Sequence, residues 1–359
     1  MLFAILLRNC EASGASCALS VAGQATDRIV PVRGEGTDER TTMETNGNLR
    51  FGVDLITLYD PSFWGMTDFN AFYDNNVLSP DVFWDRALDT LAEAGVDGVE
   101  ITFGPGHWRN ALARYGSAQG FRDAVEQRGL VVCSGFYTGL VLGGDWSPQA
   151  RREVILDEVA EYADFLRDAG CDIMIAGLPM RHTWDDDPPL FVDMAYATDL
   201  AGLINQMGYV ALKRGVRLAI HPETHAVFWL RRDLDLFLSL TDPVYVSFCP
   251  DTAHITTGGT DPVDVLRDHH GRIIISHWKD AKGRPEVRYP IDEDIFRSHH
   301  PYFARVGSGE VDWVSWVKTL RDVRFQGWAI LELDAAPDPP AQLAAAKRFV
   351  ETTLLPIYS

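Results

Sequence analysis

The sequence predicts an α/β protein, a single (β/α)8 or TIM barrel, on three observations. Short β-rich runs alternate strictly with longer helical runs from residue 50 onward, eight of each over about 310 residues. Several β-rich runs are almost continuously apolar, as RLAI and RIIIS are, which is typical of parallel strands buried on both faces. No linker divides this region, so we expect one domain over residues 50–359.

The expected elements follow in order along the chain. The strands are expected at residues 51–57, 98–102, 130–136, 172–176, 217–221, 244–249, 272–277 and 328–333. The helical runs between them have apolar residues at a spacing of about 3.6, and the last helix is expected over residues 340–353. Glycines end four of these connections just before the next strand, the usual helix stop: Gly95, Gly129, Gly170 and Gly215. Residues 283–302 are too polar for the core and predict a long loop over the seventh strand.

Composition excludes some classes of partner. The chain has 359 residues, 46% of them apolar, and a formal net charge of -19. A surface with this much negative charge repels phosphate backbones, and we therefore expect no nucleic acid as a partner. No apolar run reaches the ~18–20 residues that a membrane helix needs, so no membrane partner is expected. Cys133, Cys171 and Cys249 lie inside apolar runs, which favours buried thiols in a reduced, cytoplasmic compartment.

Residues 1–49 form a separate N-terminal extension in this interpretation. The apolar start MLFAILL has no basic residue before it, unlike a secretory signal, although the small residues of ASGASCALS leave export open. The rest is small and polar. We expect an unstructured extension or a misassigned start codon, with Met43 as the real start.

Ligand-type side chains end five of the expected strands. In such barrels the active site lies at the carboxyl ends of the strands. The residues at these ends are Glu100 on the second strand, His221 and Glu223 on the fifth, Asp251 and His254 on the sixth, His277 and Lys279 on the seventh, and Glu332 on the eighth.

Four of these residues predict a metal site: Glu223, Asp251, His277 and Glu332. Three carboxylates with one imidazole suit Mn²⁺, Mg²⁺, Co²⁺ or Zn²⁺, whereas a structural zinc site would usually include thiolates. An unpaired carboxylate is costly to bury, which favours a ligand role for Glu332 in the apolar run AILEL. The histidine pairs 269–270 and 299–300 predict solvated loop residues.

Five segments resemble the xylose-isomerase-like superfamily of sugar isomerases and epimerases, which includes inosose dehydratases, hydroxypyruvate isomerase and ketose 3-epimerases. The likeness covers residues 50–355, and its segments are GVDGVEI, IHPE, CPDTAH, SHWKD and VGSGEVDWVSWVKTLRDVRFQGWAILELD. SHWKD and PDTAHITTGGTDP are most similar to the inosose dehydratase branch. The insertion at residues 283–302 departs from the compact epimerases.

The resemblance implies a divalent metal ion, with Mn²⁺ as the first expectation, held by Asp251, His277 and Glu332. Many relatives have glutamate where this chain has His221. The ligand from the fifth strand is therefore either Glu223, which the usual preference for carboxylate favours, or His221, because residues two apart on a strand face the same way.

The resemblance also implies the residues that bind and convert the substrate. The expected substrate-binding residues are Glu100, His221, His254 and Lys279. The expected catalytic residues are Glu223, Glu332, His254 and Lys279. In a lyase either His254 or Lys279 could be the acid, and Lys279 could instead pair with a substrate oxygen or with Glu100.

The activity that the resemblance implies is that of a metal-dependent sugar isomerase or epimerase, which removes the proton next to a carbonyl and forms an enediolate. One alternative is a keto-sugar lyase, similar to inosose dehydratases or to C-glycoside deglycosidases, and another is a non-catalytic sugar-binding barrel. The expected partner is a small sugar or cyclitol. A homo-oligomer is left open, and a C-glycoside deglycosidase would need a small partner subunit.

Overall fold

The computed structural model describes residues 49–184 and 186–358, and the extension with its possible start at Met43 lies outside the described residues. The described part has the predicted barrel architecture, with eight parallel strands in the order β6-β5-β4-β3-β2-β1-β10-β7. Bridges between Phe248 and Ile273 and between Asp251 and His277 join the two outer strands and close the ring. The strands are β1 (Leu49–Asp54), β2 (Gly98–Ile101), β3 (Val131–Tyr137), β4 (Ile173–Gly177), β5 (Arg217–His221), β6 (Val246–Phe248), β7 (Ile275–Trp278) and β10 (Gly327–Leu331).

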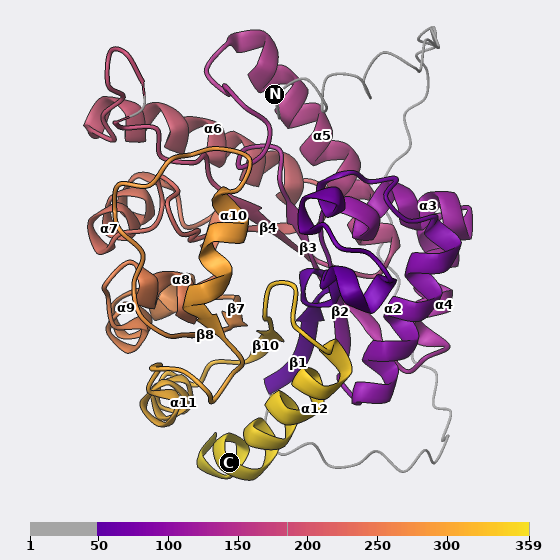
Figure 1. Cartoon of the computed structure of the whole chain (residues 1–359). Helices are drawn as coiled ribbons and strands as arrows, with labels where there is room; N and C mark the ends of the chain where they lie inside the picture. Colours follow the sequence, from indigo (N-terminus) through magenta and orange to yellow (C-terminus); the bar gives the residue numbers. More distant parts are fainter. Residues whose placement is uncertain (1–48, 185, 359) are drawn as a thin grey trace, which may run out of the picture. The chain divides into compact units, whose positions relative to one another are not determined.

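Helices surround this ring of strands (Figure 1). Two connections carry a pair of helices, α3 with α4 and α8 with α9, where the sequence predicts one. The helices are α2 (Pro80–Ala94), α3 (Trp108–Tyr115), α4 (Ala118–Glu126), α5 (Gln149–Asp168), α6 (Met194–Leu212), α7 (Arg231–Leu240), α8 (Thr252–Thr257), α9 (Pro262–His269), α11 (Trp313–Asp322), α12 (Pro339–Phe349) and α13 (Leu355–Tyr358). None of the helices in the described ranges is both long and apolar enough to cross a membrane.

Two strands end two or three residues earlier than the sequence predicts. The first ends at Asp54, because its carboxylate accepts a hydrogen bond from the Ile56 amide (2.7 Å) and caps the 3-10 turn Leu55–Leu58. The last ends at Leu331, so Glu332 lies just beyond β10. Both carboxylates therefore stand at the mouth of the barrel.

An apolar layer forms the floor beneath that mouth. Ala219 and Ile275 lie two residues before His221 and His277 on the same strands, so each pair shares the inner face. They pack in one buried cluster with Cys133, Cys249 and Ile330. The burial of the cysteines in the described chain agrees with the sequence prediction, and this layer separates the polar mouth from the other end of the barrel.

Residues 283–302 are more ordered than the predicted loop. The short strands β8 (Asp280–Ala281) and β9 (Phe303–Ala304) pair antiparallel, so this insertion leaves and rejoins the barrel at one place. It contains a helix, α10 (Ile295–His299). In Figure 1 this orange segment crosses the near side of the ring. The prediction of a solvated His299 is wrong, because the side chain is 1% exposed.

Asp280 fixes the base of the insertion. Its carboxylate accepts hydrogen bonds from the backbone amides of Gly307 (3.0 Å), Gly309 (2.9 Å) and Val311 (3.0 Å) and from the Trp313 indole (2.8 Å). A side chain at position 309 would collide with the Ala281 carbonyl at 2.2 Å, so glycine is required there. The segment VGSGEVDW therefore surrounds the carboxylate of Asp280, the residue that follows Lys279.

We expect Asp280→Ala to lower the free energy of unfolding by about 3 kcal/mol or more, because it leaves several buried donors without an acceptor. Urea denaturation measures this loss. The control is Asp322→Ala, which removes an exposed carboxylate whose one ion-pair partner among the described residues is Arg321 and should cost less than about 0.5 kcal/mol. Similar losses in the two variants would contradict the anchoring role of Asp280.

Candidate active site

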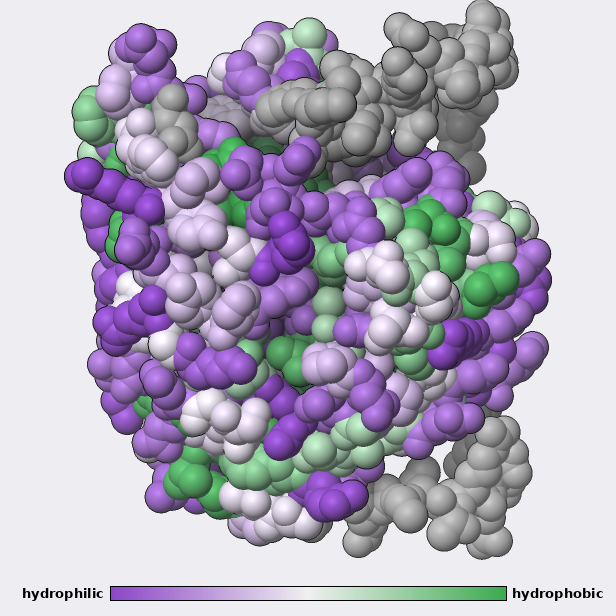
Figure 2. All heavy atoms as spheres, viewed as in Figure 1, coloured by the Kyte–Doolittle hydropathy of each residue, from purple (hydrophilic) through white to green (hydrophobic). Residues whose placement is uncertain are grey.

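A cavity opens at the carboxyl ends of the strands, with about 510 Å³ of empty space including its open mouth. Figure 2 shows a largely hydrophilic face with hydrophobic side chains around a central hollow. Six of the residues predicted from the sequence line the cavity: His221, Glu223, His254, His277, Lys279 and Glu332. Glu100 and Asp251, also predicted, lie outside this lining and are buried behind it.

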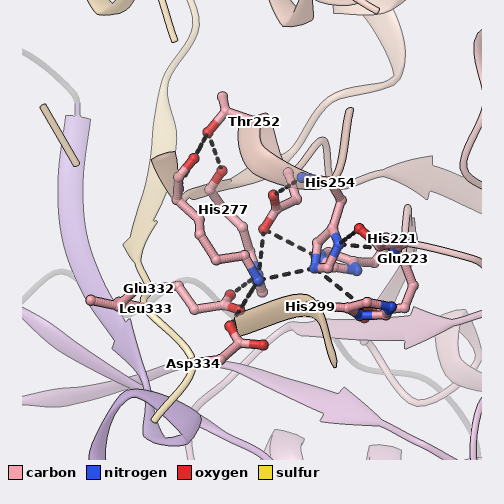
Figure 3. A network of polar contacts seen from close by, with 12 residues as sticks. His221, Glu223, Thr252, His254, His277, His299, Glu332, Leu333 and Asp334 are labelled. Carbon is pink, nitrogen blue, oxygen red and sulfur yellow. Dashed lines mark hydrogen bonds and ion pairs between the residues drawn. The ribbon is translucent and has the colours of Figure 1, made fainter. Parts of the chain in front are cut away.

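Figure 3 shows Glu332, Asp334 and His254 in one network of polar contacts. Hydrogen bonds place Lys279, whose side chain is fully buried, at the centre of this network. Its Nζ donates hydrogen bonds to Glu332 Oε1 (2.5 Å) and Asp334 Oδ1 (3.0 Å), and it lies 3.6 Å from Asp251 Oδ2. Burial opposes the charge of this ammonium group. The surrounding carboxylates outweigh that effect and hold the pKa of Lys279 well above its ordinary value, so it stays protonated.

Glu332 stands between two cationic partners. Its Oε2 lies 2.5 Å from His277 Nδ1, and its Oε1 accepts from Lys279. Although burial raises the pKa of Glu332, Lys279 and His277 lower it well below the ordinary value. For His277, burial lowers the pKa, but neighbours that include Cys249, Glu100 and Glu332 raise it well above its usual range. Glu332 is therefore a firmly ionised carboxylate.

Glu223 has a different environment. Its Oε1 lies 3.3 Å from His254 Nε2 and 3.9 Å from His299 Nδ1, and no lysine or arginine of the described chain forms an ion pair with it. Burial raises the pKa of Glu223 well above its ordinary value, and the more distant Lys279 offsets this only in part. Two glutamates in one cavity thus differ in their affinity for a proton.

His254 has a defined tautomer. The backbone amide of Thr224 donates to His254 Nδ1 (2.9 Å), so the proton of the neutral ring must be on Nε2. Burial, reinforced by Lys279, lowers the pKa of His254 well below its usual value and keeps the ring neutral. Its Nε2 lies 2.9 Å from Lys279 Nζ, so two proton donors converge on one point of the cavity.

Several buried ligand atoms form no hydrogen bond, although His277 Nδ1 and Glu332 Oε2 face each other at 2.5 Å. They include both ring nitrogens of His221, Asp251 Oδ2, Glu100 Oε1, His277 Nδ1 and Glu332 Oε2. His221 Nε2 lies 3.7 Å from Asp251 Oδ2. Three groups of residues have potential ligand atoms within 4.8 Å of one another: His221 with Asp251 and His277, Asp251 with His254 and Glu332, and Asp54 with Glu100 and His277. This donor set fits a divalent cation, and Glu223 belongs to none of these groups in the described chain.

Glu100 lies behind His277 rather than in the cavity. Its Oε1 is 3.1 Å from His277 Nε2, and the Ser134 hydroxyl donates to its Oε2. Asp54 lies close by, and burial, together with the charge of Glu100, raises the pKa of Asp54 well above its ordinary value. A carboxylate that holds one nitrogen of a histidine leaves the other nitrogen free to face a metal.

Three site residues were not assigned a role from the sequence: Asp54, Asp334 and His299. Asp54 ends the first strand as a carboxylate, and that signal could have identified it. Asp334 directly follows the apolar run of the last strand, and burial raises its pKa to about 7. His299 has only polar neighbours in the sequence, so no local signal marks it.

His299 and His225 form a buried pair that joins the insertion to the loop after β5. His225 has a left-handed backbone (φ 66°), and its Nε2 donates to the Glu286 carbonyl (2.7 Å). Its Nδ1 must then accept from His299 Nε2 (2.9 Å). Burial lowers the pKa of both rings below the usual value, and for His299 well below it.

The fold and the cavity define a TIM barrel with a candidate metal site at its mouth. The chain belongs to the xylose isomerase-like TIM barrel family, whose sequence model matches residues 88–353. It is 24% identical over 282 residues to an inosose dehydratase of Mesomycoplasma hyopneumoniae (strain 7448), covering 76% of this chain and 89% of the relative. It is 22% identical over 290 residues to an inosose dehydratase of Geobacillus thermodenitrificans (strain NG80-2), covering 77% and 91%.

Solved structures share the fold at lower identity. The probable 3-DHS dehydratase involved in petrobactin synthesis from Bacillus anthracis has a TM-score of 0.63 at 14% identity, covering 85% of this chain and 99% of that one. An L-ribulose 3-epimerase has a TM-score of 0.62 at 15% identity, covering 86% and 95%. Both likenesses show the shared fold.

We expect the stability advantage of the wild type over His299→Gln to shrink as the pH falls from 7.5 to 5.5. In the unfolded chain this histidine binds a proton near its ordinary pKa of 6.5, but the folded protein holds it neutral. Acidification therefore destabilises the wild type relative to the variant, by up to about 1.4 kcal/mol. Urea denaturation at both pH values measures the difference. His270→Gln, at an exposed position, is the control, and a constant difference for His299→Gln would contradict the neutral assignment.

Proposed function

We propose that the protein is a metal-dependent lyase that removes the proton next to the carbonyl of a keto-sugar or keto-cyclitol and then expels the neighbouring β-hydroxyl as water. The unequal pair of glutamates in the cavity carries this proposal. Elimination needs a proton acceptor and groups that assist the leaving hydroxyl, and the cavity has one carboxylate without a lysine or arginine partner among the described residues, Glu223, beside the converging donors His254 and Lys279. The curated relatives named inosose dehydratase support the same class of reaction.

We assign the metal to His221, Asp251, His277 and Glu332. The support is chemical: these residues contain the buried nitrogen and oxygen atoms that have no hydrogen-bond partner. A divalent ion bound there would polarise the substrate carbonyl and acidify the adjacent C–H bond. This assignment replaces Glu223, the ligand first expected from the fifth strand, with His221, its alternative.

Glu223 is then the general base. A base works best when its pKa is near the working pH, and burial raises the pKa of Glu223 in that direction. Glu332 is a poor base because Lys279 and His277 stabilise its ionised form. Glu332 instead holds Lys279 protonated and in place.

Lys279 and His254 interact with the β-hydroxyl group that leaves. The ammonium group of Lys279 and the Nε2–H of His254 donate hydrogen bonds to the β-hydroxyl, and the proton that Glu223 has removed from carbon passes to this oxygen, which leaves as water. Their 2.9 Å separation lets both reach one oxygen atom. The buried floor and walls exclude water from this step.

A metal-dependent isomerase or epimerase is the second candidate. It is favoured by one observation: Glu223 and Glu332 both line the cavity, so two carboxylates could exchange protons with a bound ketose. Epimerisation would require Glu332 to accept and return a proton although the ammonium group of Lys279, at 2.5 Å, stabilises its ionised form. The low proton affinity of Glu332 therefore ranks this function second.

The substrate is not phosphorylated in either proposal. Among the described residues that line the cavity, Lys279 is the only lysine or arginine, and carboxylates already surround it. A phosphate group would need at least one cation free to bind it.

Measurements of metal affinity distinguish His221 from Glu223 as the ligand that the fifth strand supplies. Relative to the wild type, we expect His221→Ala and Asp251→Asn to raise the dissociation constant for Mn²⁺ at least tenfold. Glu100→Gln should raise it about 10- to 100-fold by releasing His277. Glu223→Gln should change it less than about threefold. Isothermal titration of EDTA-stripped protein measures each value, with the shift in melting temperature as a second readout. Strong loss in Glu223→Gln with none in His221→Ala would restore Glu223 as the ligand.

Proton exchange tests the reaction. We incubate the Mn²⁺-loaded protein with ketohexoses, keto-inositols and the methyl and phenyl 3-keto-glucosides in D₂O and follow the products by NMR and mass spectrometry. A lyase gives a product lighter by one water, whereas an isomerase or epimerase places deuterium on one carbon without that loss. Glu223→Gln should lower the rate by ~10²–10⁴, while the exposed control Glu161→Gln should not. The proposal would be overturned if none of these compounds underwent either deuterium exchange or elimination.

A further inference from the structure

The cavity has an apolar end that the proposed chemistry does not use. The ionisable side chains gather where the last four strands of the ring end. The opposite wall comes from the loops after β1, β2 and β3 and from the insertion. It consists of Ile56, Tyr73, Phe103, Val141, Leu142 and Phe296, all half-buried, so each keeps some accessible surface.

Three aromatic rings form a continuous face in this wall. Tyr73 and Phe103 stack with ring centres 5.3 Å apart and planes within 7°. Phe296 of α10 lies 5.9 Å from Tyr73 at 42°. Phe103 is supported from behind by the buried Tyr59, whose ring meets it edge-on at 5.6 Å. The face is therefore assembled before any ligand binds.

Contacts across the mouth hold Phe296 over this face. In and around α10, His299 bonds His225, Asn70 donates to Asp294 (2.9 Å), and Phe69 meets His300 edge-on at 4.6 Å. The insertion thus connects the loop after β5 to the loop after β1. Its main contribution to the cavity lining is an apolar ring, not a polar group.

Such a wall does not suit a bare polyol. A free ketose or cyclitol has a hydroxyl on almost every carbon, and each one loses its water partners on entry. Apart from the cluster of ionisable groups, the lining offers the hydroxyls of Thr102, Thr138 and Tyr73. A flat apolar group, by contrast, is stabilised by stacking on aromatic rings and by burial of its surface.

We propose that the substrate carries an aromatic substituent beside its sugar ring, and that Tyr73, Phe103 and Phe296 form the subsite that binds it. This inference rests on the proposed function, because the ionisable end of the cavity orients the sugar. The substrate class is then an aryl-substituted keto-sugar rather than a free ketose or cyclitol. Phe296 makes the insertion a determinant of specificity.

Binding without turnover tests the subsite. The probes are phenyl and methyl β-glycosides of glucose, galactose and xylose, titrated into the Mn²⁺-loaded full chain and followed by saturation-transfer NMR and calorimetry. For at least one sugar, we expect the phenyl glycoside to bind about tenfold more tightly than its methyl counterpart. Saturation transfer should be strongest at the phenyl protons.

Substitutions of Phe296 test whether this residue causes the preference for the phenyl glycoside. Phe296→Ala and Phe296→Leu should each reduce the preference for the phenyl glycoside to less than threefold; the leucine variant keeps an apolar side chain in α10 if the alanine variant unfolds. Phe191→Ala is the control, because Phe191 is 70% exposed outside the cavity and its loss should leave the preference unchanged. Equal binding within all three pairs, no binding of any phenyl glycoside, or a preference that survives both Phe296 variants would overturn the subsite. A failure of the proposed lyase reaction would instead appear in the D₂O experiment and leave this preference intact.

Discussion

A buried ammonium group organises the mouth of this barrel. Lys279 is fully enclosed, and a charge in that position is tolerated only when opposite charges compensate the lost water. Its partners Asp251, Glu332 and Asp334 follow β6 and β10, so one side chain joins the ends of three strands. Removing any partner would leave uncompensated charge in the interior. The identities of these residues therefore depend on one another, and the site is maintained as a unit.

The ammonium group of Lys279 also gives the two glutamates of the cavity different affinities for a proton. Glu332 lies against it and stays ionised, whereas Glu223 lies farther away and, because of burial, holds a proton more readily. In such a site the residue type alone does not determine which group is the acid, the base or the ligand. Burial and the neighbouring charges determine these roles. Behind this arrangement, Asp280 anchors the backbone next to Lys279 through the amides of residues 307–311, so the charge has a fixed position.

Local pattern predicts much of this fold and part of its site. The eight strands were predictable because each is a short apolar run, and Asp251, His277 and Lys279 were recognisable because they end such runs. His221 and Glu223 could not be distinguished, because the two-residue alternation holds only within a strand and β5 ends at His221. The burial of His299 depends on His225, which is 74 positions away along the chain, so its polar neighbours gave a false indication.

The paired strands β8 and β9 also have an evolutionary consequence. Because the insertion departs and returns through residues that face each other, Ala281 and Phe303, its length can change without shifting the register of any barrel strand. Mutation and recombination could therefore replace the segment over the mouth while the charged groups beneath it stay unchanged. A lineage built on this barrel can diversify the compounds it recognises faster than the reaction it performs.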